Sequence, residues 1–188
     1  MNKAIRGGVI AVGIVVAIAA YFGDNIRGYY RFKELCETEG GLKVFRPLLK
    51  NVGWQASSYE DARSAAHFTQ IAFARFTDAK DGRSYDLRYL GGHPADDSSY
   101  EKLAAKPDTP VVYAWNWVAE TLPGEVRTSR SGLKVIDIAT GKVQMQWLQI
   151  GYRTFDQDRT LLAAPSGNAC HSWSGIWEPQ NQSKYFVN

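Results

Sequence analysis

Hydrophobic residues fill one long stretch near the start of the chain and leave it without a polar face. Residues 7–23, GGVIAVGIVVAIAAYFG, contain no charged side chain and lie between Arg6 and Asp24. As an α-helix they would span roughly 25 Å, close to the ~30 Å hydrocarbon core of a bilayer. A helix on the surface of a soluble domain needs a polar face for water, so this pattern predicts a helix that enters a membrane.

Three interpretations of this segment stay open. The favoured one is a single-pass anchor over residues 1–23, with Lys3 and Arg6 on the cytoplasmic side. The second is a cleavable signal peptide, because residues 17–19 (Ala-Ile-Ala) match the small-x-small cleavage pattern. The third is a buried core helix. The first two both export residues 24–188, which we expect in the periplasm, tethered to the inner (cytoplasmic) membrane or, after cleavage, periplasmic or secreted.

The helical spacing of apolar residues continues past the leader and then stops. Ile26, Tyr29 and Tyr30 fall near one stripe at intervals of three to four residues. Gly40 is a natural left-handed stop for this helix. Residues 41–49, GLKVFRPLL, are interrupted by a proline and predict a short edge strand.

Residues 57–76 carry the clearest pattern of an amphipathic helix. Ser57 and Glu60 match a capping box, and the acidic residues of the first turn suit a helix N-terminus. Alanines together with Phe68 and Ile71 give the segment a broad apolar side. We therefore expect one helix along the whole segment.

Alternation of apolar and polar residues predicts antiparallel strands in the rest of the chain. Residues 78–84 predict a turn, and residues 84–90 a short strand. Residues 91–110 read as a polar loop with one helical turn over 100–105. Residues 111–122 follow as a second strand.

The best hairpin signal lies in residues 126–154. Asp137 opens the turn, Gly141 supplies a positive φ, and apolar alternation runs on both sides. The second strand would place three apolar side chains on one face: Val143, Met145 and Trp147. The fold class we predict is α+β, an N-terminal transmembrane helix followed by one small domain in which two main helices pack on an antiparallel β-sheet.

Composition supports a folded domain and argues against a nucleic-acid binder. The chain is 45% hydrophobic and 13% aromatic, which is more than disordered chains contain. Its net charge is +3, and Lys3 and Arg6 in the leader account for two of the positive charges. The remaining basic residues do not cluster, whereas nucleic-acid binders carry a basic patch. We expect the membrane as a partner and no nucleic acid.

Cys36 and Cys170 are the two cysteines of the chain, and they predict a disulfide. In an oxidising compartment two cysteines in one domain most often form a structural bond. An unpaired or intermolecular thiol is the second interpretation. The third is a nucleophilic Cys170 with His67 or His93 as its base, because strand neighbours such as Cys170 and His171 point to opposite faces.

No spacing in the chain points to a metal, a cofactor or a catalytic set. His67, His93, His171 and the two cysteines match neither C-x-x-C nor H-E-x-x-H. A phosphate-binding glycine motif and a G-x-S-x-G elbow are likewise absent from the sequence. We therefore predict no catalytic, metal or cofactor residues.

The aromatic residues Tyr113, Trp115 and Trp117 share one face of the strand predicted over 111–122. They are candidates for a stacking platform, because Trp and Tyr dominate such contacts. They also suit the core between sheet and helices, since each ring can bury on the order of 150–250 Å². The sequence favours the core and keeps the three residues as a possible binding face.

The leading functional hypothesis is a non-enzymatic, membrane-tethered envelope domain that acts by binding another protein. Such a domain would be an accessory subunit of an envelope assembly, or an inhibitor or immunity-type partner. A periplasmic binder of a small molecule or glycan, using the aromatic face, is the first alternative. A hydrolase with an unrecognised Cys/His site is the second.

The anchor makes a direct prediction for the full-length protein. It should stay with membranes after an alkaline carbonate wash, because an uncharged run such as residues 7–23 partitions strongly into hydrocarbon. Mass spectrometry of the mature N-terminus provides the check. A mature chain that begins at Ala20 or Tyr21 would establish the signal peptide instead.

Overall fold

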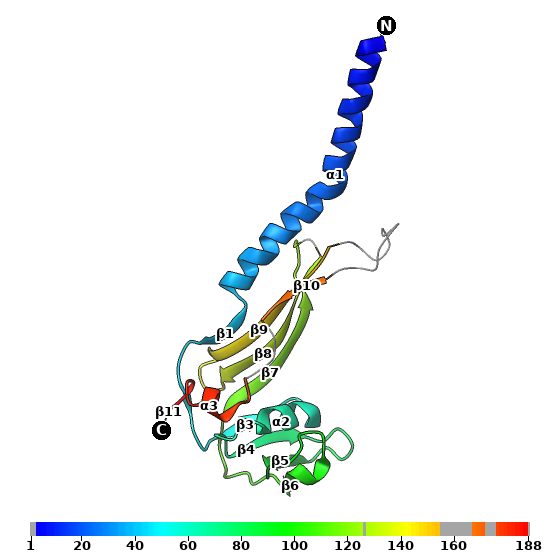
Figure 1. The fold of residues 1–188 in the computed structure, drawn as a ribbon. Coiled ribbons are helices and arrows are strands. Elements are labelled where there is room, and N and C mark those ends of the chain that lie inside the picture. Colours follow the sequence, from blue (N-terminus) through cyan, green and yellow to red (C-terminus); the bar gives the residue numbers. More distant parts are fainter. Residues whose placement is uncertain (1–2, 126, 155–166, 172–175, 188) are drawn as a thin grey trace.

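The structure is a computed structural model that describes residues 3–125, 127–154, 167–171 and 176–187. It is an α+β fold with one large mixed sheet and a long N-terminal helix (Figure 1). The helices are α1 (Lys3–Thr38), α2 (Tyr59–Ala66) and α3 (Pro179–Gln182), with a 3₁₀ turn at Asp97–Ser99. The strands are β1 (Gly41–Val44), β2 (Leu48–Leu49), β3 (Gly53–Gln55), β4 (Phe73–Thr77), β5 (Ser84–Tyr89), β6 (Tyr100–Ala104), β7 (Val111–Thr121), β8 (Thr128–Asp137), β9 (Val143–Arg153), β10 (Gly167–Cys170) and β11 (Phe186–Val187).

Helix α1 joins the apolar leader to the domain without a break. Its N-terminal part projects away from the sheet, and its C-terminal part lies along it (Figure 1). By length and composition the part from Ala11 to Thr38 is apolar enough to cross a membrane, a test that a signal sequence also passes. The side chains of Lys3 and Arg6, on which the predicted orientation rests, lie outside the described part.

Helix α1 ends at Thr38, and the glycine with the left-handed backbone lies one residue beyond the predicted Gly40. The backbone N–H groups of Glu39 and Gly40 both donate to Leu35 O, at 2.8 and 3.1 Å. The positive φ, 79°, belongs to Gly41 and not to Gly40. A glycine in this left-handed conformation ends the helix without a Cβ clash and turns the chain into β1.

The sheet is mixed, so the expectation of a purely antiparallel sheet is wrong. Its strand order is β1-β9-β8-β7-β3-β4-β5-β6, and β10 also pairs with β9. Strand β3 runs parallel to both β4 and β7. Parallel neighbours need a crossover connection, and α2 supplies it between β3 and β4. A separate parallel pair joins β11 to β2.

The helix predicted over 57–76 is wrong in its second half. Helix α2 ends at Ala66, and residues 73–77 form β4. Asp61 N donates to Ser58 Oγ at 3.1 Å, so Ser58 and not Ser57 caps the helix. Phe73, Ala74 and Phe76 are buried in the sheet. A short apolar run is compatible with a helix or with a strand. Here residues 73–77 form a strand because they pair with β3 and β5.

The helical turn predicted over residues 100–105 is also wrong. These residues form β6, which pairs antiparallel with β5 from Tyr89–Tyr100 to Tyr85–Ala104. β6 is an edge strand in which Lys102, Leu103 and Ala104 are exposed, and its sequence shows no alternation of apolar and polar residues that would indicate a strand.

Other local predictions are confirmed in full or in part. Residues 78–84 turn between β4 and β5. The edge strand predicted over 41–49 forms over Gly41–Val44 as β1, whereas Leu48–Leu49 form β2 in a separate sheet. The β8–β9 hairpin forms as expected, with Asp137 Oδ1 accepting from Thr140 N at 2.8 Å and Gly141 at φ 67°. Met145 and Trp147 are buried on the same face of β9.

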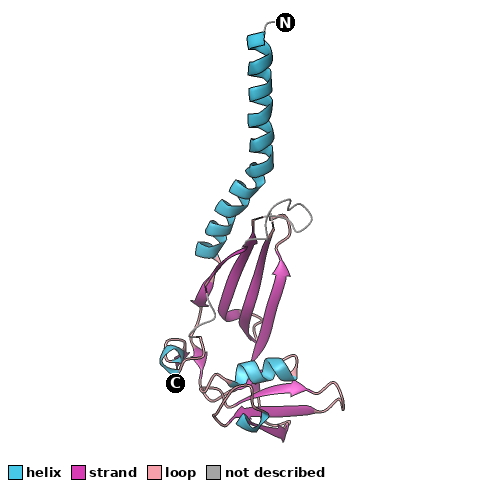
Figure 2. Ribbon diagram, turned by 45° about the vertical axis from the view of Figure 1, so that its right-hand side comes forward, coloured by secondary structure: helices cyan, strands magenta, loops and turns pink. Residues whose placement is uncertain are grey.

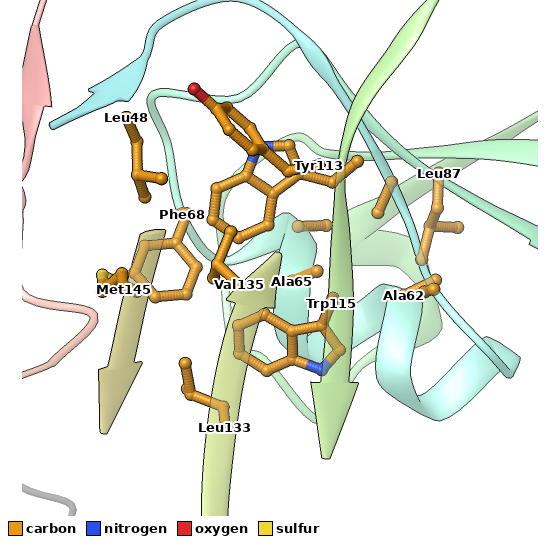
Figure 3. Close-up of a cluster of buried hydrophobic side chains, with 14 of the residues drawn as sticks. Leu48, Ala62, Ala65, Phe68, Leu87, Tyr113, Trp115, Leu133, Val135 and Met145 are labelled. Carbon is orange, nitrogen blue, oxygen red and sulfur yellow. The ribbon is translucent and has the colours of Figure 1, made fainter. Parts of the chain in front are cut away.

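The sheet has a different cover on each face. Residues directly opposite each other on paired strands share a face, which places Trp115, Val135 and Met145 together. They join the main core with α2 and with the C-terminal segment, including Tyr185 and Phe186 (Figure 3). Burial raises the pKa of Tyr185 to about 12.

The opposite face of the same strands receives the C-terminal part of α1. Ile150 and Tyr152 point away from Met145 and Trp147 because strand residues alternate. They form a second cluster with α1. The two main helices therefore pack on opposite faces, and Figure 2 shows the long strands beside α1 and the short ones beside α2.

Gly141 tests the hairpin turn. Replacement of Gly141 by Val should lower the free energy of unfolding by about 1–2 kcal/mol, because a β-branched residue resists positive φ. A Cβ at this position meets no atom within 4 Å, so the effect would be backbone strain and not a clash. Chemical denaturation measures it. Gly141→Asn is the control and should cost less, since Asn tolerates the left-handed region; equal midpoints for all three proteins would contradict the assignment.

Candidate functional site

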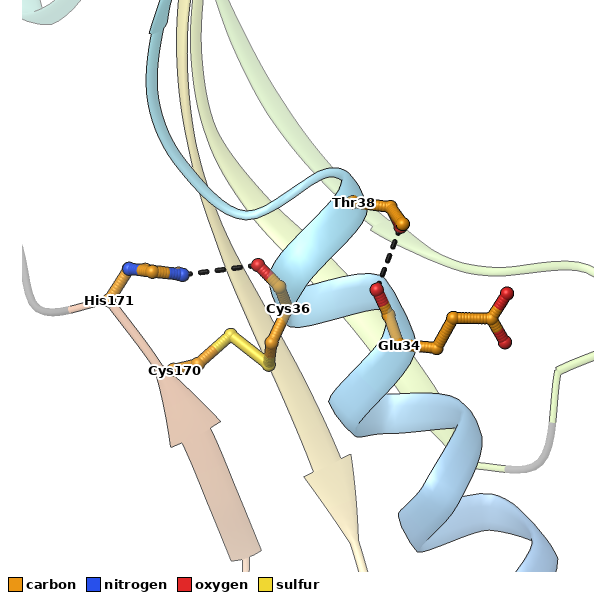
Figure 4. The surroundings of a disulfide bond; sticks show 5 residues. All are labelled: Glu34, Cys36, Thr38, Cys170 and His171. Atoms are coloured by element: carbon orange, nitrogen blue, oxygen red, sulfur yellow. Dashed lines mark hydrogen bonds between the residues drawn. A yellow bond between two sulfur atoms is a disulfide. The ribbon is translucent and has the colours of Figure 1, made fainter.

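The junction between α1 and the sheet contains the predicted cysteine pair. The Sγ atoms of Cys36 and Cys170 lie 2.12 Å apart, and their Cα atoms are separated by 6.0 Å (Figure 4). Cys36 lies in the last turn of α1 and Cys170 ends β10, where it stands opposite Ile150 of β9. The bond therefore ties the helix to the strand that already pairs with β9. A disulfide here fits an extracytoplasmic domain.

His171 takes part in the same junction, a role that the sequence did not indicate. Its Nε2 lies 3.2 Å from Cys36 O, where a ring N–H can donate to a carbonyl at the end of α1 (Figure 4). The alternation argument had placed Cys170 and His171 on opposite faces. It fails because His171 leaves the strand with φ 63°, which turns its ring back toward Cys36.

Apolar contacts continue the junction along α1. Phe32 and Leu35 are buried against Ile150, Tyr152 and Leu122. Full burial of such a side chain contributes roughly 1.5–3 kcal/mol.

Close approach of helix and sheet depends on a glycine. The ring of Tyr152 lies over Gly28, where a Cβ would come within 2.7 Å of it. Tyr152 Oη also donates to Asn25 O at 3.0 Å. The contact between α1 and the sheet therefore begins at Asn25, directly after the apolar leader.

Ion pairs accompany the apolar contacts. Arg31 Nε lies 2.8 Å from Glu125 Oε1, and Arg130 Nη1 lies 3.0 Å from Glu39 Oε2. Arg130 also pairs with Glu120. Exposed pairs of this kind contribute about 0–1 kcal/mol each, so the disulfide and the buried side chains dominate the junction.

The predicted aromatic binding face does not lie at the surface as a unit. Tyr113 is 4% exposed and Trp115 0%, and both belong to the main core. Tyr113 Oη accepts from Leu49 N at 3.2 Å. Only Trp117, with 48% exposure, is available to solvent among the three. A stacking platform needs exposed rings, so the structure leaves Trp117 alone in that role.

Trp115 nevertheless borders a cavity. The cavity lies where β3 ends and β7 continues, and its volume is about 360 Å³. Its lining also includes Gln55, Ser57 and Asn116. The Nε1 atom of Trp115 is buried and has no hydrogen-bond partner in the described chain. Because an indole N–H is a donor only, this buried group lacks an acceptor among the described residues.

The two histidines considered as catalytic bases are hydrogen-bonded to other groups. His67 Nε2 bonds to Tyr100 Oη, which itself donates to Pro94 O at 3.0 Å. Burial, together with the charge of Arg63, lowers the pKa of His67. His93 Nδ1 accepts from Ala95 N at 3.2 Å.

The nucleophile hypothesis requires a free thiolate at Cys170, and in the structure its Sγ is bonded to Cys36. Within the described ranges no three side chains of His, Cys, Asp or Glu gather closely enough to hold a metal ion.

Exposed apolar side chains gather beyond the junction, on and after β1. We call this set the edge patch; it consists of Leu42 (40% exposed), Val44 (38%), Phe45 (56%), Leu49 (44%) and Val187 (41%). Leu49 and Val187 are partners in the β2–β11 pair. Strand β1 stands at the end of the sheet order, so its outer edge carries no further strand among the described residues. The sequence predicted this edge strand but not its exposed apolar side chains.

Comparison with known proteins adds no assignment: no protein-family model matches the chain, and neither a curated protein nor a solved structure is significantly similar to it.

The disulfide predicts a specific response to substitution. Cys36→Ser and Cys170→Ser should each lower the free energy of unfolding by a similar few kcal/mol, because either change removes the same bond. The double variant should then be little less stable than either single one. Chemical denaturation of the three variants tests this.

Thiol labelling of denatured, unreduced protein, followed by peptide mapping, tests the bond itself. Two freely labelled thiols would refute it. The contact with Cys36 O leads us to expect a loss of about 0.5–1.5 kcal/mol for His171→Ala, the ordinary contribution of one hydrogen bond.

Proposed function

We propose that the protein is a non-enzymatic, membrane-tethered envelope domain that binds another envelope protein through the edge patch. The observation that carries this proposal is the combination of an open sheet edge at β1 with exposed apolar side chains on it and next to it, Leu42, Val44 and Phe45, to which the separate β2–β11 pair adds Leu49 and Val187. Isolated apolar residues are common on protein surfaces, but several exposed apolar residues on and beside one edge strand are typical of interaction sites.

The tether is supported by the continuity of α1. The apolar part of the helix continues without interruption into the part that is disulfide-bonded to the sheet, so one helix connects the proposed anchor to the domain. If the leader is cleaved near residues 17–19, the junction still remains, because its contacts begin at Asn25. Protein binding therefore does not depend on which of the two fates the leader has.

The two edges of the sheet differ in a way that favours β1 as the binding edge. The opposite edge, β6, carries Lys102, which bonds to Asp78 Oδ2 at 2.9 Å and lies over the ring of Tyr85. Charged residues on an edge strand discourage pairing with another chain. Strand β1 also carries a lysine, Lys43, but its Nζ donates to Thr38 O at the end of α1. The exposed apolar side chains of β1 are Leu42 and Val44, and a partner strand or an apolar partner surface can bury them.

The chain supplies a matched pair of variants to test this proposal. Leu42 on β1 and Leu103 on β6 are leucines on opposite edge strands with exposures of 40% and 39%. Leu42→Asp should reduce binding of the partner at least about tenfold, because burial of a leucine is worth about 1.5–3 kcal/mol and an unpaired carboxylate opposes it. Leu103→Asp should leave binding unchanged.

The measurement is quantitative affinity purification of the tagged full-length protein from detergent-solubilised membranes. Both variants are first compared with the original protein by thermal unfolding, so that loss of folding is not mistaken for loss of binding. A co-purifying protein that disappears with Leu42→Asp and persists with Leu103→Asp supports the edge patch. Equal recovery of every protein with both variants would contradict it.

A further inference from the structure

A second surface feature lies at the end of the sheet nearest the apolar leader. A cavity of about 160 Å³ opens between the ends of β7, β8 and β9, lined by Thr121, Arg127, Thr128, Ser129 and Arg153. A single water needs only about 10–15 Å³ of such space, so the cavity has room for a group of several heavy atoms. Guanidinium and hydroxyl groups dominate the described part of its lining, which contains no carboxylate.

The charge of this cavity is not neutralised by the described chain. Arg153 is exposed, and no ion pair joins its guanidinium to a carboxylate of the described residues. Arg127 donates from Nε to Arg153 O at 3.0 Å and from Nη2 to Asn25 Oδ1 at 2.5 Å, both neutral acceptors. Glu125 is close in sequence, but it is paired with Arg31. Among the described residues, the two arginines at the cavity therefore have no carboxylate partner, and their charges favour an anion.

The backbone of Arg127 is held in an unusual conformation. Its φ is 50°, in the left-handed region that a residue with a long side chain rarely adopts. Strain of this kind costs of order 1–3 kcal/mol and persists where the surrounding structure fixes it. Here the two bonds to Arg153 O and Asn25 Oδ1 hold the guanidinium beside the cavity.

The contacts with α1 place the cavity relative to the apolar leader. Asn25, which bonds to both Arg127 and Tyr152, is two residues beyond Gly23, the end of the uncharged run. Two residues of helix span about 3 Å. The headgroup layer extends roughly 5–8 Å beyond the hydrocarbon core on each side. A helix that spans the bilayer up to Gly23 therefore holds this cavity at the depth of the lipid phosphates.

We propose that the cavity binds the phosphate of an anionic phospholipid headgroup. The guanidinium groups of Arg127 and Arg153 donate to the phosphate oxygens, and the hydroxyl of Ser129 adds a neutral donor. Guanidinium–phosphate pairs are among the stronger hydrogen bonds in proteins, and juxtamembrane basic groups are attracted to anionic lipids. This proposal rests on the membrane anchor but not on the edge patch. Lipid binding would hold the domain at a fixed height and rotation above the bilayer.

The test uses the full-length protein in a non-ionic detergent, titrated with dioleoylphosphatidylglycerol and observed by native mass spectrometry. Arg153→Gln is the main variant, because Arg153 is exposed and its removal leaves the fold intact. We expect its apparent affinity for the lipid to fall roughly tenfold, as loss of a charge-assisted hydrogen bond predicts. Arg88→Gln is the control: it removes one positive charge from an exposed arginine on β5, at the end of the sheet far from α1 (Figure 1). It should bind the lipid like the original protein.

Further ligands distinguish the source of the phosphate. Dioleoylglycerol, which lacks the phosphate, should bind equally weakly to all three proteins. Inorganic phosphate at millimolar concentration should not displace the phosphatidylglycerol. Displacement would show a free-phosphate site and overturn the lipid assignment. Equal lipid affinities for Arg153→Gln and the original protein would overturn the site altogether, as would an equal loss for Arg88→Gln.

Failure of the anchor is detected separately. If the carbonate wash releases the protein and the mature N-terminus lies at Ala20 or Tyr21, the tether is refuted whatever the lipid titration shows. If the protein stays with the membranes but its lipid affinity does not depend on Arg153, the headgroup site alone is refuted. The two proposals therefore fail through different measurements.

Discussion

The bond between Cys36 and Cys170 is the constraint on which the arrangement of helix and sheet depends. Without it, α1 would touch the sheet through a few apolar side chains and ion pairs of small individual value. The bond closes a loop with a sequence separation of 134 residues. In the chain-entropy account such a loop stabilises the folded state by up to about 5 kcal/mol, comparable with the stability of many whole domains.

Strand β9 distributes this constraint through the domain. One edge of β9 pairs with β8 along most of its length. The other edge pairs first with β1, over residues 145–148, and then with β10, over residues 150–153. The strand that carries the disulfide and the strand that carries the edge patch are therefore neighbours on one edge. Cys170 stands opposite Ile150 of β9, and Val44 of β1 stands opposite Met145. With about 3.3 Å per strand residue, these two points on β9 lie on the order of 15 Å apart. The proposed binding edge would therefore keep a fixed distance from the anchor.

Local signals in the sequence were sufficient where a short segment determines its own geometry. The Asp137 and Gly141 turn is specified by a side-chain cap and a positive φ, and the apolar alternation of β9 fixes which residues are buried. The exit of α1 was predictable to within one residue for the same reason. The disulfide was predictable because the chain has two cysteines and an apolar leader, without knowledge of the distance between Cys36 and Cys170.

Local signals failed where contacts with distant parts of the chain determine the secondary structure or the burial of a residue. Residues 73–77 match a helix as well as a strand in isolation, and only β3 and β5 on either side make them a strand. Tyr113 and Trp115 look the same in sequence as Trp117, yet the first two are covered by the C-terminal segment and α2 while the third lies beyond them. The cavity between Arg127 and Arg153 likewise depends on strand ends that are 26 residues apart in the chain. A pattern along one strand cannot contain this information.

The two faces of the sheet explain why the domain can combine a rigid tether with an accessible edge. The main core, on the face of Trp115 and Met145, is closed by α2 and the C-terminal segment and does not involve α1. The opposite face is reserved for α1, whose buried contacts are with β9 and the end of β7. Because neither cover extends over the outer edge of β1, stabilising the domain and fixing it to the anchor leave Leu42 and Val44 exposed. This division between faces and edge is compatible with the proposed function, in which the sheet is held at the membrane and presents β1 to a partner.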